Sequence, residues 1–144
     1  MQPDEFHATG DLGYLDARGR LHLVGRAADV IKTGGYKVAP EEVERALGPA
    51  FRPGEVAAVG IPSEHWGEVI VAAIERAPSG WPKKAAKVAA TMTAYKRPRA
   101  FIELDELPRN AMGKVRRAAI RDHVLQHYRL VDGPHPRLEP RAPD

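Results

Sequence analysis

Two stretches of the chain carry a local excess of basic residues, although the net charge of the whole sequence is only +3. Between residues 83 and 99 there are six basic residues and no acidic one: Lys83, Lys84, Lys87, Lys96, Arg97 and Arg99. A second group follows at Arg109, Lys114, Arg116, Arg117 and Arg121. Such a field attracts phosphate-bearing ligands of any kind. Nucleic acid is not expected among them, because the sequence has no nucleic-acid-binding motif and its aromatic residues do not alternate with the basic ones.

Other side chains that often carry chemistry are absent or scattered. The chain has no Cys, which excludes disulfides, thiolate metal sites and thiol catalysis. His123 and His127 are spaced as metal ligands on a helix can be, but no convincing third ligand accompanies them, so we expect no metal site. The longest apolar run, residues 69–74, is far below the roughly 18 residues of a membrane span. The acidic, polar start is unlike a signal peptide, so we expect a cytoplasmic protein without a membrane partner.

The elements that must position these side chains alternate between strands and helices. Residues 12–25 have the pattern of a β-hairpin, and 30–38 that of two short extended runs around a glycine pair that permits a tight turn. Apolar periodicity predicts helices over 40–47, 83–92 and 115–128, and strands over 55–61, 68–75 and 100–104. The pattern predicts an α+β fold with a small mixed sheet and flanking helices, preceded by a β-hairpin.

Three segments in fixed order carry a resemblance. They are Thr9-Gly10-Asp11, then residues 25–44 (GRAADVIKTGGYKVAPEEVE), then residues 108–115 (PRNAMGKV). Their order and spacing resemble the carboxyl-terminal part of acyl-CoA synthetases, which belong to the AMP-dependent, adenylate-forming ligases. The resemblance runs from about residue 6 to residue 125. The sequence of residues 31–37, IKTGGYK, looks most like that of malonyl- and methylmalonyl-CoA synthetases.

The resemblance implies a two-step reaction. Such enzymes use ATP and Mg to activate a carboxylic acid as an acyl-adenylate, and then transfer the acyl group to CoA. It also implies three parts of the chain: 1–27 as the terminal hairpin segment of a large adenylation domain, 28–128 as a mobile lid domain, and 129–144 as a Pro-rich disordered tail. The sequence has no glycine-rich phosphate loop. We therefore expect the isolated chain not to catalyse the full reaction without an N-terminal adenylation domain, in the same protein or as a separate partner.

Lys114 is the catalytic candidate that the resemblance implies. It matches the family lysine that contacts the acyl carboxylate and the nucleotide during adenylation. A fixed ammonium there would offset the repulsion between a carboxylate and the α-phosphate. Asp11 matches the carboxylate that accepts hydrogen bonds from the ribose hydroxyls, and Arg26 matches an arginine that contacts the nucleotide. From the residues alone, each of the three could instead be an ordinary surface or turn residue.

The resemblance also implies a hinge and a surface for CoA. Ala28 stands where the family usually has a charged hinge residue, and Asp29 beside it is expected to share the hinge role. A further set is expected to face CoA: Gly34, Gly35, Lys37, Trp66, Tyr95 and Arg97. The glycines would allow close backbone approach, the aromatic rings would stack on adenine, and the cation would bind phosphate. The alternative is structural, with the glycines forming a tight turn and the aromatic rings packing.

An alternative function stays open. The chain could be a stand-alone binding or accessory module that kept the fold and binds CoA, an acyl-carrier protein or an adenylation partner. The presence of Asp11, Arg26 and Lys114 favours the ligase, because a binding module has no need of an adenylation lysine.

Overall fold

The computed structural model describes residues 11–15, 17–26, 29–52 and 54–142. The first two strands, β1 (Asp11–Leu15) and β2 (Leu21–Arg26), form an antiparallel hairpin in which the backbone of Asp11 lies opposite that of Arg26. This confirms the hairpin that the sequence predicts before the sheet.

The central sheet is mixed. It has the strand order β4-β3-β6-β5, and β7 also pairs with β6. Its strands are β3 (Ile31–Thr33), β4 (Tyr36–Val38), β5 (Val56–Ser63), β6 (Gly67–Glu75) and β7 (Ala100–Leu104). All pairs are antiparallel except β6 with β7, which are joined through helix α2 (Trp81–Thr91). A parallel pair needs such a crossover connection.

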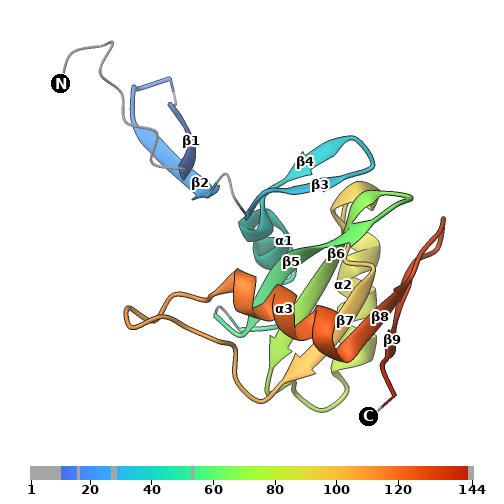
Figure 1. Cartoon of the computed structure of the whole chain (residues 1–144). Coiled ribbons are helices and arrows are strands. Elements are labelled where there is room, and N and C mark those ends of the chain that lie inside the picture. Colours follow the sequence, from blue (N-terminus) through green and yellow to red (C-terminus); the bar gives the residue numbers. More distant parts are fainter. Residues whose placement is uncertain (1–10, 16, 27–28, 53, 143–144) are drawn as a thin grey trace.

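Helices cover both faces of the sheet (Figure 1). Helix α1 (Pro40–Ala46) and α2 pack on one face, and α3 (Arg117–His127) packs on the other. Alternate residues of β5 and β6 therefore enter two separate cores. One core holds Val56, Ala58, Ile70, Ala72 and Ile74, and the other holds Ala57, Val59, Val69, Val71 and Ala73. Burial on both faces explains why these strands appear in the sequence as continuous apolar runs.

Side chains from α1 and α3 close the free edge of β5. The Ala58 N–H donates to Glu44 Oε2 (2.9 Å), and Arg121 Nε donates to the Gly60 carbonyl (3.0 Å). Arg117 binds Glu44 through Nη2 (2.8 Å to Oε2) and also forms ion pairs with Asp29 and Glu41. Burial raises the pKa of Glu44, and the Ala58 and Arg117 donors oppose that effect. Pairing of the edge groups keeps them unavailable to another strand.

The prediction of a disordered tail from residue 129 is wrong for the described residues. Strands β8 (Tyr128–Val131) and β9 (Arg137–Pro140) form an antiparallel hairpin, and Leu130 and Leu138 pack against the core beneath α3. The prolines fit this hairpin because two lie in its turn and Pro140 ends a strand, where a missing N–H costs little. In the described part of the chain, no helix is long and apolar enough to cross a membrane.

Candidate functional site

Lys114 lies on the loop between β7 and α3, which extends away from the body of the domain (Figure 1). The loop folds back on itself, because the backbones of Arg109 and Val115 pair in antiparallel fashion. Asn110 Oδ1 accepts hydrogen bonds from the N–H groups of Met112 (2.9 Å) and Lys114 (3.0 Å). Gly113 has φ of +83°, a backbone conformation in which other residues are strained. Local bonds therefore fix the shape of this loop.

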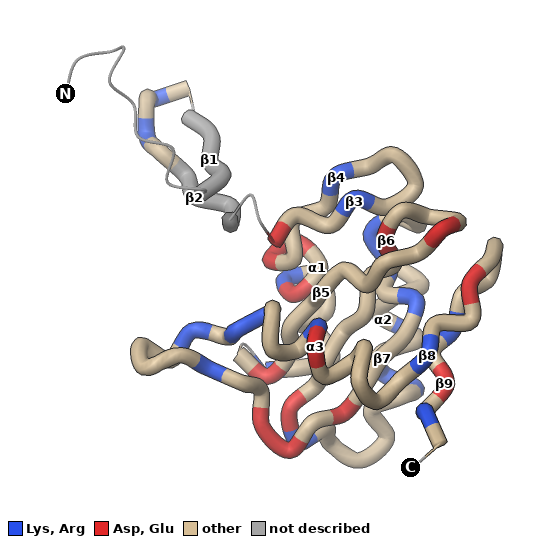
Figure 2. The backbone as a smooth tube through the Cα atoms, in the orientation of Figure 1, with Lys and Arg blue, Asp and Glu red and all other residues tan. Residues whose placement is uncertain are grey.

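The tip of the loop is open to solvent. Met112 is 82% exposed, Lys114 is exposed, and within the described residues nothing hydrogen-bonds or ion-pairs with the Lys114 ammonium. Other basic residues recur along the same loop, as Figure 2 shows by its blue segments. The result is an exposed cation on a loop whose shape is fixed by its own hydrogen bonds.

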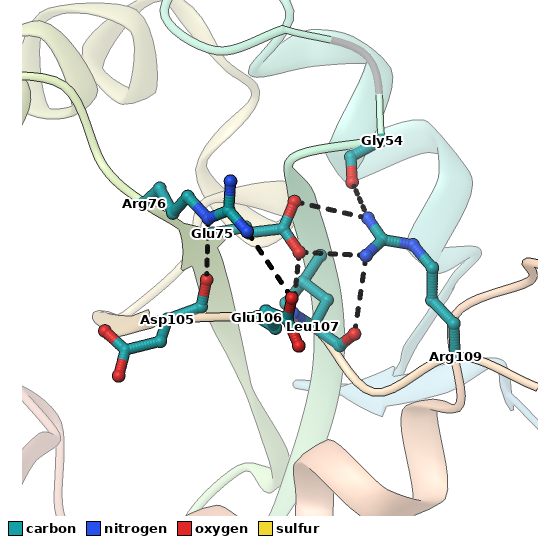
Figure 3. A network of polar contacts seen from close by, with 7 residues as sticks. All are labelled: Gly54, Glu75, Arg76, Asp105, Glu106, Leu107 and Arg109. Carbon is teal, nitrogen blue, oxygen red and sulfur yellow. Dashed lines mark hydrogen bonds and ion pairs between the residues drawn. The ribbon is translucent and has the colours of Figure 1, made fainter.

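An arginine–carboxylate network anchors the base of this loop (Figure 3). Arg109 donates to Glu75 Oε1 at the end of β6 (2.8 Å) and to the Gly54 carbonyl before β5 (2.6 Å). Glu75 Oε1 also accepts the Leu107 N–H (2.9 Å). The Arg109 hydrogen bond, then the Leu107 N–H, lowers the pKa of Glu75. Arg109 therefore supports the base of the loop. The sequence analysis did not predict its contact with Glu75, because the two residues are far apart in the chain.

The predicted glycine turn and Trp66 lie together. Gly34 has φ of +58° and Gly35 of +86°, which favours glycine at both positions. The Gly34 N–H donates to the Trp66 carbonyl (2.9 Å), and a Cβ on Gly34 would lie 3.3 Å from the Trp66 ring. The close approach that Gly34 permits is therefore to Trp66. A Cβ on Gly35 would meet nothing within 4 Å, so this is the glycine that is open to a ligand.

The remaining residues predicted to contact CoA have different surroundings. Tyr95 stacks on Tyr36 of β4, with ring centroids 3.9 Å apart and planes within 8°, so it adjoins the glycine turn. Lys37 is exposed on β4, opposite Lys32. Arg97 donates to the carbonyls of Met92 (2.9 Å) and Ala90 (3.0 Å). These carbonyls end helix α2, so much of the Arg97 guanidinium is engaged within the fold.

Two side chains beside this cluster were not singled out from the sequence. Arg99 places its guanidinium carbon 4.9 Å from the centre of the Trp66 ring, which is a cation–π contact. Tyr36 is 52% exposed although it stacks on Tyr95. The acid-free run of residues 83–99 contains Arg99, but only the fold brings it to Trp66.

The Lys114 loop and the cluster around Trp66 and the Gly34–Gly35 turn lie at opposite ends of the β5–β6 pair. Gly54 and Glu75, which anchor the Lys114 loop, adjoin the end where Val56 pairs with Ile74. Trp66 and Gly34 lie at the other end, where Ser63 pairs with Gly67. At ~3.3 Å per residue, this strand pair separates the two clusters by about 23 Å.

The nucleotide and hinge candidates are only partly described. The side chains of Asp11 and Arg26, and Ala28 as a whole, lie outside the described residues, although the backbone register places Asp11 opposite Arg26. Asp29 is half-buried, and its Oδ2 lies 3.5 Å from Arg117 Nη1. Asp29 is therefore tied to the first turn of α3.

His123 and His127 lie on the same face of α3, with ring centroids 4.4 Å apart. Burial, and then the charge of His127, lowers the pKa of His123. Among the described residues, no group of three or more His, Cys, Asp or Glu side chains is placed to hold a metal ion.

Comparison with known proteins identifies the class to which this fold and loop belong. Residues 42–114 match the AMP-binding enzyme C-terminal domain, and the chain belongs to that family. It is 37% identical over 135 residues to a 4-chlorobenzoate–CoA ligase of an Arthrobacter species, covering 92% of this chain and 26% of the ligase. It is 39% identical over 127 residues to an indoleacetate–CoA ligase of Aromatoleum aromaticum, covering 85% and 25%. The resemblance drawn from the three sequence segments is confirmed.

Solved structures of acyl-CoA synthetases agree with this family assignment. The ATP-bound MatB of Rhodopseudomonas palustris superposes with a TM-score of 0.69 at 33% identity, over 80% of this chain and 24% of MatB. The o-succinylbenzoate CoA synthetase MenE of Bacillus subtilis, in complex with its acyl-adenylate intermediate, gives 0.68 at 37% identity, over 79% and 24%. The chain thus spans about a quarter of the length of the relatives it matches.

Proposed function

We propose that this chain is the mobile C-terminal domain of an acyl-CoA ligase, and that it serves both half-reactions. In the first it supplies Lys114 for activation of a carboxylic acid with ATP. In the second it presents the Gly34–Gly35 turn to CoA. The observation that carries the proposal is the Lys114 loop, which is shaped by its own hydrogen bonds, anchored at its base and exposed at its tip.

The role of Lys114 follows from charge. Attack of a carboxylate on the α-phosphate brings two anionic groups together, and a positioned ammonium stabilises the transition state more than it stabilises the separated reactants. A loop that already holds its shape loses little conformational entropy when it enters the cleft. ATP and Mg would be held mainly by the adenylation domain, with Asp11 and Arg26 contacting the nucleotide from the hairpin.

The two ends of the β5–β6 pair fit two poses of one domain. One pose brings the Lys114 loop to the reacting groups, and the other brings the Gly34–Gly35 turn, with Trp66, Tyr95, Lys37 and Arg99 nearby. Asp29 is held by Arg117 on α3, so it moves with the domain. The rotation therefore falls mainly on the residues just before it, around Ala28.

The matched relatives act on different acids, so they do not identify the acid substrate of this ligase. The matched ligases are named for 4-chlorobenzoate, indoleacetate and sulfoacetate, and their identities to this chain are 37%, 39% and 39%. Similar identity with such different acids indicates that the selection of the acid lies outside this segment.

The test is a half-reaction assay with this chain joined to, or mixed with, an adenylation domain. Lys114→Ala should slow pyrophosphate release by about 10²- to 10³-fold, because a charge contact to the transition state is lost. Thioester formation from preformed acyl-adenylate should continue. Lys83→Ala, which removes an exposed lysine of α2, is the matched control and should leave both rates unchanged.

Equal loss in both half-reactions, or none in either, would contradict the role of Lys114. The chain alone is expected to release no pyrophosphate from ATP and acid. Calorimetry of the isolated chain with CoA addresses the alternative function. Tight CoA binding, together with adenylation that does not depend on Lys114, would favour an accessory binding module.

A further inference from the structure

One carboxylate of the carboxyl-terminal hairpin binds the turn between β5 and β6. Asp132 Oδ1 accepts the Ser63 hydroxyl (2.7 Å), and Oδ2 accepts the N–H groups of Glu64 (2.7 Å) and His65 (3.4 Å). These N–H groups belong to the turn and have no partner strand. A carboxylate that accepts consecutive turn N–H groups is a strong local anchor.

The same contacts fix Trp66 at both its backbone and its ring. Ser63 Oγ, which donates to Asp132, accepts the Trp66 backbone N–H (2.9 Å). The Trp66 indole N–H donates to the carbonyl of Gly133, the residue after Asp132 (2.9 Å). The hairpin therefore sets both the position of Trp66 and the direction of its indole.

Trp66 in turn sets the position of the glycine turn. Strand β3 pairs with β6 through one residue pair, Thr33 with Gly67, and the Gly34 N–H bonds to the Trp66 carbonyl. The Trp66 ring lies against Gly34, because a Cβ added there would be 3.3 Å from the ring, closer than an ordinary van der Waals contact. A shift of the β5–β6 turn would therefore move the Gly34–Gly35 turn with it.

We propose that the β8–β9 hairpin is a clamp that positions Trp66 and the Gly34–Gly35 turn, with Asp132 as its positioning residue. The hydroxyl of Ser63 lowers the pKa of Asp132, and the turn N–H groups add to this effect, so the carboxylate stays charged and able to accept. The consequence for CoA rests on the proposed function, whereas the structural part does not.

The structural part is tested by NMR on the 144-residue chain. Asp132→Asn keeps the size of the side chain but replaces an acceptor oxygen by an NH2 group. We expect amide exchange at Glu64 and His65 to speed up by about tenfold, because each amide loses a charged acceptor. The Trp66 indole N–H resonance should also shift. Glu139→Gln is the matched control, since among the described residues Glu139 bonds only to Arg129 and Arg137 on the same hairpin.

Point variants are used in place of deletion, because Leu130 and Leu138 pack against the core and deleting them would destabilise the domain. Unchanged exchange at Glu64 and His65 in Asp132→Asn would overturn the clamp. Equal changes in Asp132→Asn and Glu139→Gln would also overturn it, since they would indicate a general loosening of the hairpin.

The functional part is tested in the ligase with both half-reactions measured. Asp132→Asn should raise the KM for CoA by about tenfold, while the adenylation rate stays within about twofold, because the Lys114 loop lies at the other end of the strand pair. An unchanged KM for CoA with faster amide exchange would overturn the link to CoA. Failure of the proposed function would show differently, as adenylation that survives Lys114→Ala.

Discussion

The two ends of the β5–β6 pair are built in opposite ways. The Lys114 end is a loop whose exposed tip is shaped by internal bonds. Its base is anchored by Arg109, by the Leu107 N–H and by Arg76. The Trp66 end is a surface made from four segments distant in sequence: the β3–β4 turn, the β5–β6 turn, the residues around Tyr95 and Arg99, and the carboxyl-terminal hairpin.

The difference matches what each end would have to do. A residue that must enter another domain needs a shape fixed without help from its surroundings, so its bonds are local. A surface that must accept part of a ligand can be fixed by its neighbours and needs no free tip. Rigid support of a site lowers the cost of ordering it when the ligand binds.

The largest effect is expected where the Trp66 end is most tightly packed. Gly34→Val places a branched side chain at positive φ and against the Trp66 ring, so it should lower the free energy of unfolding by about 2–3 kcal/mol. Gly35→Val is the matched control, because Gly35 also has a positive φ (+86°) but has open space around it, and it should cost about 1–2 kcal/mol. Urea unfolding measures both. Equal losses would indicate that the Trp66 contact adds nothing.

At the other end, Arg109→Met removes the side chain that joins the base of the Lys114 loop to Glu75 and Gly54. The stability loss should be only about 1 kcal/mol, because 32% of the Arg109 side chain is exposed and water screens its pairing. In the ligase, adenylation should slow by about tenfold through misplacement of Lys114, with thioester formation preserved. Arg109→Lys keeps the charge but not the fork that reaches both Glu75 and Gly54, so an intermediate rate is expected. Equal slowing of both half-reactions would contradict the proposal that the Lys114 end serves adenylation and the Trp66 end serves thioester formation.

Asn110→Ala should act more weakly and only on the loop. It removes the acceptor of the Met112 and Lys114 N–H groups, both exposed, so the expected cost is about 0.5–1 kcal/mol. Adenylation should slow by about threefold. Asn110→Asp keeps the acceptor oxygen and should behave nearly as the parent chain. Amide exchange at Met112 and Lys114 measures the change directly, and protection that persists in Asn110→Ala would show that the loop is shaped by something else.

The sequence was sufficient to predict the elements that bury apolar residues. The runs of β5 and β6, the Gly34–Gly35 turn and the three helices are all present, with the second helix starting at Trp81 rather than residue 83. Pro82 lies in the first turn of that helix, where its missing N–H has no cost. The Lys114 motif was identified through the family resemblance, whereas the bonds of Asn110 that shape its loop were not predicted.

Hydrogen bonds and ion pairs that join segments far apart in the chain could not be predicted from the sequence. Arg109 and Glu75 are 34 positions apart, and Asp132 and Glu64 are 68 apart, so no local spacing links them. Four prolines after residue 133 suggested a disordered tail, and they outweighed the apolar residues at 130 and 138 that hold the hairpin to the core. Arg97 was assigned to CoA by its place in the chain, whereas its bonds are to the end of α2.

The smallest effect expected is a loss of stability at low pH. It involves one carboxylate at each end of the β5–β6 pair, Glu75 and Asp132. The pKa of Glu75 is lowered from 4.5 and that of Asp132 from 3.8. A carboxyl group whose pKa is lower when folded adds stability above its unfolded pKa and loses it as pH falls through the folded pKa. Both anchors should therefore hold unchanged between pH 7 and about pH 5, and weaken only below about pH 4. Thermal unfolding against pH tests this, because Glu75→Gln and Asp132→Asn should each flatten the acid side of the curve, whereas a slope already present above pH 5 would place the sensitive group elsewhere.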